Sequence, residues 1–146
     1  MMRILLDTDV VLDFLLARQP FEQDARAIWI ACAQGRVVGY VSPITPVNVF
    51  YIARKSKGVA GARQLVGDML RILKICLLDQ AVIQAAHALP MDDFEDAVQA
   101  ASAAAAGLDG LVTRNSKHYS AAPLTILTPV EALARLPSAE QPPMAP

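Results

Sequence analysis

The sequence has little cysteine, few aromatic residues and no long uncharged apolar run. Its two cysteines, Cys32 and Cys76, lie in no CxxC pair and beside no histidine cluster. This excludes a disulfide framework and a zinc ribbon, and we expect reduced thiols in a cytoplasmic protein. Only 5% of the 146 residues are aromatic, and the three tyrosines show no spacing typical of a base-stacking platform.

Hydrophobic runs of transmembrane length are also missing, although 54% of the residues are apolar. Stretches without a charged residue, such as the one between Asp79 and Asp92, are all shorter than the roughly 18–20 residues that span a bilayer. Asp7, Asp9 and Asp13 interrupt the segment where a signal peptide would be apolar. We therefore expect neither a membrane segment nor an export signal.

The net charge is close to zero, with 13 Lys and Arg against 14 Asp and Glu, but charges of opposite sign are separated along the chain. Residues 54–74 hold six basic residues and one acid, whereas residues 79–109 hold six acids and neither Lys nor Arg. Exposed helix faces would explain these blocks. An acidic metal cluster beside a basic surface for a polyanion would explain them equally well.

Short apolar runs alternate with segments of helical periodicity, which predicts a parallel sheet covered by helices on both faces. The expected strands span residues 3–7, 36–41, 75–78, 110–113 and 124–127. The first expected helix follows Asp7 and is capped by Asp9 or Asp13, and the last begins at Pro129. The helices between them span about 21–33, 43–57, 60–73, 80–88 and 92–107. We expect one domain over residues 1–136, with Phe14, Phe21 and Trp29 in its core, and a disordered proline-rich tail over residues 137–146.

Polar segments follow several of the expected strands. Asp7, Asp79 and the loop 114–119 each come after a strand, and the helix opened by residues 92–96 can reach the same edge. Because sites in open parallel sheets form at the carboxyl ends of the strands, we expect these segments to meet there.

The acidic residues at the start of the alanine-rich helix have two interpretations. Asp93 and Asp96 are three residues apart and share a helix face at its amino end, where acids are common as caps. Small residues surround the rest of this helix, which favours close packing and partial burial of the acids facing Asp7. Carboxylates gathered out of water are neutralised by a hard divalent cation such as Mg²⁺ or Mn²⁺.

Three segments in this order resemble the PIN-domain family, in particular bacterial toxins of toxin–antitoxin pairs. They are MRILLDTDVVLD (residues 2–13), DFEDAVQAA (93–101) and LVTRNSKHY (111–119). The resemblance extends to about Leu136 and implies a three-layer α/β/α sandwich with a central parallel sheet. It further implies an endoribonuclease dependent on Mg²⁺ or Mn²⁺, with RNA as substrate, an antitoxin protein as a possible partner and a homodimer as the expected state.

The resemblance also implies roles for individual residues. Asp7 and Asp96 would hold the metal, and Asp93 would ligate it or orient a water. Asn115 would position substrate or water at a place where many family members have an aspartate, and His118 stands where others have an acid. The residues expected to contact RNA are Asn48 (usually a glutamate in the family), Arg54, Lys55, Arg114 and Lys117, with Thr113 and Ser116 as weaker candidates.

The two asparagines reduce the negative charge of the site, which predicts one well-held ion and a weaker second one. They also favour an alternative, a PIN-fold module that binds RNA or protein without cleaving. A dehalogenase-like phosphatase is disfavoured because no Lys or Arg lies between Lys74 and Arg114, and a receiver domain because the paired acids are missing.

Overall fold

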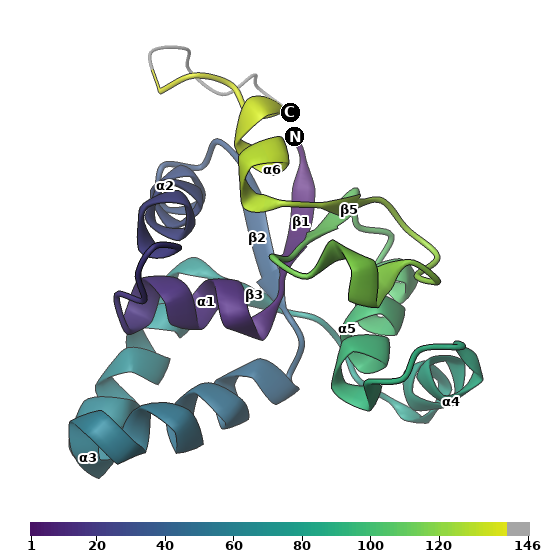
Figure 1. Cartoon of the computed structure of the whole chain (residues 1–146), viewed down its shortest axis with the longest axis horizontal. Helices are drawn as coiled ribbons and strands as arrows, with labels where there is room; N and C mark the ends of the chain where they lie inside the picture. The colour runs from purple at the N-terminus through teal and green to yellow at the C-terminus, as the bar shows by residue number, and fades with distance from the viewer. Residues whose placement is uncertain (140–146) are drawn as a thin grey trace.

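A computed structural model describes residues 1–139 of the chain (Figure 1). Its five strands are β1 (Arg3–Leu6), β2 (Val38–Val41), β3 (Lys74–Ile75), β4 (Gly110–Val112) and β5 (Ile126–Leu127). Its helices are α1 (Thr8–Leu15), α2 (Glu22–Ala33), α3 (Ile44–Ile72), α4 (Gln80–Ala88), α5 (Phe94–Ala105), the 3₁₀ turn η1 (Ser116–Tyr119) and α6 (Pro129–Ala134). From residue 140 onward, the expected tail lies outside the described residues.

The strands form one sheet in the order β3-β2-β1-β4-β5, and every neighbouring pair is parallel. Successive side chains of β1 point to opposite faces, as in any strand. Ile4 and Leu6 pack into the core beneath α1 and α2, whereas Leu5 packs with Ala100 of α5 on the other side. The central strand is buried on both faces because helices cover both, and this confirms the predicted three-layer fold.

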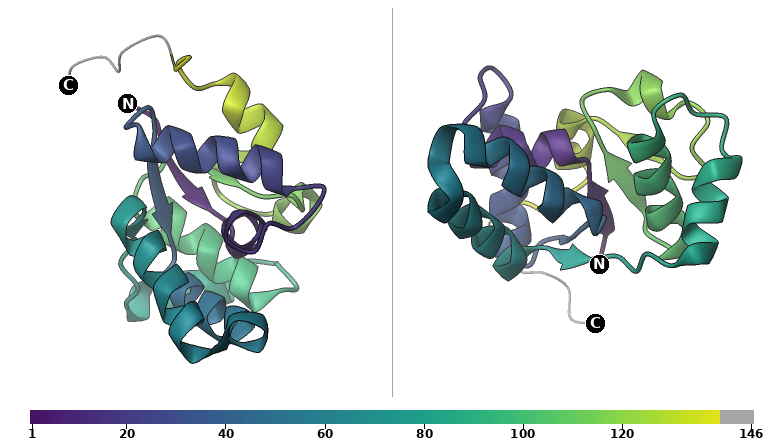
Figure 2. Two further views of the ribbon diagram at one scale, coloured as in Figure 1. Left: turned by 90° about the vertical axis from the view of Figure 1, so that its left-hand side faces the viewer. Right: turned by 90° about the horizontal axis from the view of Figure 1, so that it is seen from below.

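The two outer layers are unequal in size. Helices α1, α2 and α6 lie on one face of the sheet together with the second half of α3, and α4, α5 and η1 lie on the other (Figures 1 and 2). Along the chain, β1, β2 and β3 are added in one direction, and β4 and β5 then extend the sheet on the other side of β1. The order therefore reverses between β1 and β4, and α/β sheets bind ligands outside the strand ends at such a point.

Helix α3 joins the two helices that the sequence predicted over residues 43–57 and 60–73. Gly58, between its two arms, has φ 70° and ψ 176°, which is not helical. The arms run back beside each other on the outside of the molecule (Figure 2, right). Because Gly58 changes the direction of α3, the first arm begins at the carboxyl edge of the sheet and the second arm returns toward α2.

Several local predictions need correction. Strand β3 covers Lys74–Ile75 rather than 75–78, because it pairs with β2 alone at the sheet edge and leaves Leu77 85% exposed. Asp7, not Asp9 or Asp13, caps α1 through its side chain. Phe21 is 40% exposed rather than part of the core. None of the helices within residues 1–139 combines the length and the apolar character needed to cross a membrane.

Candidate active site at the carboxyl edge of the sheet

Three segments that are distant in sequence meet outside the carboxyl ends of β1 and β4. Asp7 directly follows β1, Asp96 lies in the first turn of α5, and Asn115 is in the loop after β4. They line a cavity of about 360 Å³. Its complete lining consists of Asp7, Thr8, Asp9, Asn48, Ile52, Asp93, Glu95, Asp96, Asn115 and His118.

Asp7 is held in place by several hydrogen bonds although its side chain is almost fully buried. The Thr113 hydroxyl donates to Oδ2 at 2.7 Å, the Gln99 amide donates to Oδ1 at 3.2 Å, and the Asp9 backbone N–H donates to Oδ1 at 3.3 Å. Burial raises the pKa of Asp7, and the hydrogen bonds from Thr113 and Gln99 oppose this rise. Asp7 thus presents a fixed, poorly solvated carboxylate to the cavity.

Asp96 is the second acidic side chain enclosed at this edge. Its pKa is raised to about 6, chiefly by burial and also by the nearby charge of Asp7. The Tyr119 hydroxyl donates to Asp96 Oδ1 at 3.0 Å, and His118 Nδ1 lies 3.7 Å from Oδ2. Two carboxylates that disfavour each other's ionisation in this way favour either protonation of one of them or a cation between them.

Asp93 lies at the mouth of the cavity rather than inside it. It is the N-cap of α5, and its Oδ1 accepts the backbone N–H of Asp96 at 2.9 Å. Its side chain is exposed, in contrast to the predicted burial. The structural role of a cap therefore accounts for one oxygen of Asp93, and any role toward a metal falls to the other.

Gln99 and Tyr119 complete the site, and sequence analysis assigned a role to neither. Both are fully buried, and the Gln99 amide donates to Asp7 and to the Tyr119 oxygen at 3.1 Å. One signal was present in the sequence, because Gln99 is a large polar residue among alanines, about one turn after Asp96. The partner of Tyr119 depends on tertiary packing, which local patterns do not contain.

The two asparagines both line the cavity. Asn48 comes from the first arm of α3, which is tied to the start of α1 by a hydrogen bond of 2.9 Å between the hydroxyls of Thr45 and Thr8. Asn115 follows Thr113, whose hydroxyl oxygen accepts the Asn115 backbone N–H at 3.0 Å. Thr113 was predicted as a weak phosphate contact, but its fully buried hydroxyl faces Asp7 instead.

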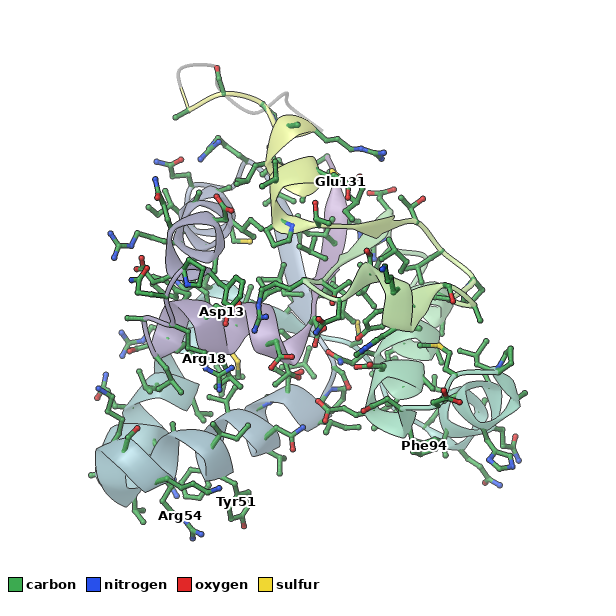
Figure 3. The ribbon with its side chains drawn as sticks, in the orientation of Figure 1. Asp13, Arg18, Tyr51, Arg54, Phe94 and Glu131 are labelled. Carbon is green, nitrogen blue, oxygen red and sulfur yellow. The ribbon has the colours of Figure 1, made fainter. Side chains whose placement is uncertain are left out.

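Arg114 does not point freely toward a ligand. Its guanidinium donates to both oxygens of the buried Asp13, at 2.6 and 3.2 Å, and lies over the Phe21 ring with 3.8 Å between Cζ and the ring centroid. Figure 3 shows Asp13 on α1 and Arg18 nearby, just after the end of that helix. The ion pair anchors the loop after β4 to α1, so Arg114 supports the position of Asn115.

The predicted basic residues lie in different places around the cavity. Arg54 stacks over Tyr51 at 5.1 Å, at the outer end of the first arm of α3 (Figure 3). Lys55 is exposed one turn beyond Ile52 and seven residues after Asn48, on the helix face that lines the cavity. Lys117 lines a second cavity of about 270 Å³, which shares Asp93 and His118 with the first.

Asp79 does not join the site, contrary to prediction. Its side chain caps α4 by accepting the Val82 N–H at 2.9 Å. It follows β3, the edge strand, and two strands separate β3 from β4, so Asp79 lies away from the reversal point.

The oxygen-rich lining fits a hard divalent cation held in an open site. Within residues 1–139, no group of three or more His, Cys, Asp or Glu side chains is arranged so that it could hold a metal ion. Mg²⁺ rarely needs so many protein ligands, because it keeps several waters and binds through one or two carboxylates together with substrate phosphates. Asp7 and Asp96 can supply these carboxylates, and Asn115 can add a neutral oxygen.

Known structures share this fold. A toxin–antitoxin complex from Klebsiella pneumoniae contains a chain with 23% identity and a TM-score of 0.66, over 86% of this chain and 97% of that one. A DNA-bound VapBC from Salmonella typhimurium has 19% sequence identity and a TM-score of 0.68, over 88% of this chain and 99% of that one. VapC20 from Mycobacterium tuberculosis, a sarcin–ricin loop cleaving toxin, has 15% sequence identity and a TM-score of 0.60, over 74% of this chain and 86% of that one.

Sequence comparison gives the family directly. No curated protein matches the chain. A family model described as PIN domain matches residues 3–117, a segment that begins at β1 and ends in η1 and so includes Asp7, Asp96 and Asn115. The chain therefore belongs to the PIN domain family.

Proposed function

We propose that the chain is a metal-dependent endoribonuclease that hydrolyses RNA phosphodiester bonds, with Mg²⁺ or Mn²⁺ as its ion. The observation that carries this proposal is the meeting of Asp7 and Asp96, from opposite parts of the chain, in one polar cavity at the reversal point of the sheet. Membership of the PIN domain family and the fold shared with an RNA-cleaving toxin support it.

In this proposal, different residues bind the metal ion and position the water or the phosphate. Asp7 and Asp96 hold the ion, while Thr113 keeps Asp7 in one orientation through its hydroxyl. When bound, a divalent ion activates a water and neutralises the charge that develops on the phosphate. The Asn115 amide orients the attacking water or a phosphate oxygen at the cavity wall, and the free oxygen of Asp93 ligates or orders water at the mouth.

RNA would approach along the first arm of α3. Lys55 lies on the face that continues the cavity wall beyond Asn48 and Ile52, and Lys117 lines the adjoining cavity. Phosphate contacts from lysine give affinity without sequence preference, as backbone binding requires. Arg54 stacks on Tyr51 and makes the weaker contribution, and Arg114 acts mainly through its ion pair with Asp13.

The proposal includes a protein partner. Chains of this fold occur in toxin–antitoxin complexes, and the two arms of α3 enclose an apolar groove of about 530 Å³ in this chain. Val47, Tyr51 and Leu70 line it and are each more than half exposed. Such exposed apolar surface marks protein contacts. We propose a cytoplasmic homodimer that is controlled by an antitoxin.

Cleavage of a labelled structured RNA by the purified full chain tests the function. We expect cleavage with Mn²⁺ or Mg²⁺, none with EDTA, and a loss of at least about 100-fold in Asp96→Asn and Asp7→Asn, because each removes a charge that holds the ion. Asp92→Asn, on the exposed segment before α5, is the matched control and should cleave normally.

Two results would contradict the proposed nuclease function. Cleavage that survives Asp96→Asn would come from a contaminating enzyme. Retained RNA binding without cleavage in Mn²⁺ would favour the alternative, an inactive PIN-fold module, which the two asparagines in the cavity lining also support.

A further inference from the structure

Two buried side chains connect the proposed metal carboxylates through hydrogen bonds. Gln99 is 0% and Tyr119 is 1% exposed. The Gln99 nitrogen donates to Asp7 Oδ1 at 3.2 Å and to the Tyr119 oxygen at 3.1 Å, and the Tyr119 hydroxyl donates to Asp96 Oδ1 at 3.0 Å. Asp7 and Asp96 are thus joined by three successive hydrogen bonds, which we call the Gln99–Tyr119 bridge.

The direction of every hydrogen bond in the bridge is determined. The Thr8 backbone N–H lies 3.1 Å from Gln99 Oε1, and only the oxygen of an amide can accept this hydrogen. The amide nitrogen must then face Asp7 and Tyr119 and uses both of its hydrogens on them. The tyrosine oxygen is therefore an acceptor toward Gln99, and its single hydrogen goes to Asp96.

The bridge also determines which carboxylate oxygens are available to a cation. Asp7 Oδ1 already accepts two hydrogen bonds, from Gln99 and from the Asp9 backbone, so both of its lone pairs are used. Asp7 Oδ2 accepts one hydrogen bond, from Thr113, and keeps one lone pair. On Asp96, Oδ1 accepts one hydrogen bond, from Tyr119, and keeps one lone pair, whereas no hydrogen bond from the described residues reaches Oδ2, the oxygen on the side of His118.

We propose that Gln99 and Tyr119 are positioning residues, which fix the spacing of Asp7 and Asp96 and direct one Oδ2 atom of each toward a divalent cation. This inference rests on the proposed function, because it takes the cation to bind between these carboxylates. Neither residue touches the ion or the RNA. They act as the buried partners that orient metal ligands in proteins, whose removal weakens metal affinity by about 10–100-fold.

Removal of one hydroxyl tests the bridge. Mn²⁺ affinity of the full chain is measured by titration in Tyr119→Phe and in Tyr40→Phe, whose hydroxyl accepts from Arg3 at 3.4 Å on β2, away from the cavity lining. We expect about 10-fold weaker Mn²⁺ binding for Tyr119→Phe and no change for Tyr40→Phe. Circular dichroism at the titration temperature confirms that both variants are folded, which separates positioning from a loss of stability.

A second measurement uses the unaltered chain and does not depend on the variants folding. Addition of Mg²⁺ should shift the side-chain amide resonances of Gln99, because its acceptor Asp7 changes its charge environment. Gln64, whose amide donates to Asp68 at 3.1 Å on the exposed surface of α3, should not shift.

The outcomes separate this inference from the function on which it rests. Equal Mn²⁺ affinity in Tyr119→Phe and Tyr40→Phe, or a Gln99 resonance that stays fixed while Mg²⁺ binds, would overturn the bridge and leave the nuclease intact. Absence of any Mg²⁺ or Mn²⁺ binding by the unaltered chain would overturn both.

Discussion

The proposed chemistry needs an ionised Asp96, whereas the stability of the fold favours a protonated one. The pKa of Asp96 rises from 3.8 to about 6 because the side chain is buried and Asp7 lies nearby. The folded chain therefore binds a proton at Asp96 more tightly than the unfolded chain does. The stability that this group contributes is complete below pH 3.8 and is lost as the pH rises through about 6. At neutral pH without a cation, the ionised Asp96 destabilises the fold.

Asp96→Asn should therefore stabilise the chain at pH 7 in EDTA. The amide removes the buried charge and still accepts the Tyr119 hydroxyl. We expect a gain of about 1–2 kcal/mol in the free energy of unfolding, less than the roughly 3 kcal/mol of a fully buried group, because the cavity admits solvent. Urea unfolding measures it, with Asp92→Asn as a control that should change nothing.

With Mn²⁺ bound, the unaltered chain should become more stable than Asp96→Asn. A ligand that binds only the folded state raises its stability, so Mn²⁺ should stabilise the unaltered chain and not Asp96→Asn. A lower unfolding free energy of Asp96→Asn in EDTA would show that Asp96 is a structural acid and would contradict this reading of the site.

Arg114 illustrates the opposite case, a charged residue whose main partner belongs to the fold. Its guanidinium pairs with Asp13, whose side chain is 1% exposed. Arg114→Ala would leave this buried carboxylate with only the more distant Arg18, whose Nη1 lies 4.0 Å from Asp13 Oδ1, and we expect a loss of about 3 kcal/mol in the free energy of unfolding. Adding Asp13→Asn should recover part of the loss, because the poorly compensated charge disappears. A double variant that is less stable than Arg114→Ala alone would contradict the explanation.

At the scale of elements, the bend of α3 decides where the first arm lies relative to the cavity. Gly58 adopts φ 70° and ψ 176°, a conformation that is almost exclusive to glycine. Gly58→Ala should therefore destabilise the chain by about 1–3 kcal/mol although nothing lies within 4 Å of the added Cβ.

Gly67 provides the matched control for Gly58. It lies in the helical second arm, also with open space around an added Cβ, and alanine there should stabilise the chain by about 0.5–1 kcal/mol. Thermal unfolding of both variants gives the comparison. The account of the bend would be wrong if both substitutions changed stability in the same direction.

The elements themselves were largely predictable from the sequence, because each depends on local signals. Apolar runs ending in turn residues gave the positions of the strands, and Gly58 lies between the two predicted arms of α3. The short β3 was less predictable, since its length depends on how far β2 pairs with it at the sheet edge. The cap of α1 was also missed, because Asp7 serves the helix and the cavity at once.

At the scale of the whole molecule, the site arises where the strand order reverses. The rule for parallel sheets was sufficient to predict that Asp7 and Asp96 approach each other, and both line one cavity. The same rule placed Asp79 there wrongly, because strand order cannot be read from local patterns and β3 lies at the edge. The roles of Gln99, Tyr119 and Arg114 could not be predicted, because their hydrogen bonds and ion pair join residues that are far apart in sequence.

The proposed path of RNA gives a prediction at this scale. Lys55→Gln should weaken binding of a non-cleaved RNA and reduce the slope of log affinity against log salt by about 1, because one phosphate contact is lost. Arg54→Gln, one residue earlier on the face of Tyr51, should have a smaller effect. Fluorescence anisotropy between about 50 and 200 mM salt measures both. A larger effect of Arg54→Gln would place the RNA on the groove side of α3.

The central claim is that Asp7 and Asp96 hold one divalent cation at the carboxyl edge of the sheet. Crystals of the full chain soaked in Mn²⁺ and measured at the manganese absorption edge test it most directly. We predict an anomalous peak in the cavity, with oxygens of Asp7 and Asp96 within about 2.5 Å of the ion, and no such peak in Asp96→Asn. Anomalous density elsewhere, or an empty cavity at saturating Mn²⁺, would contradict the claim.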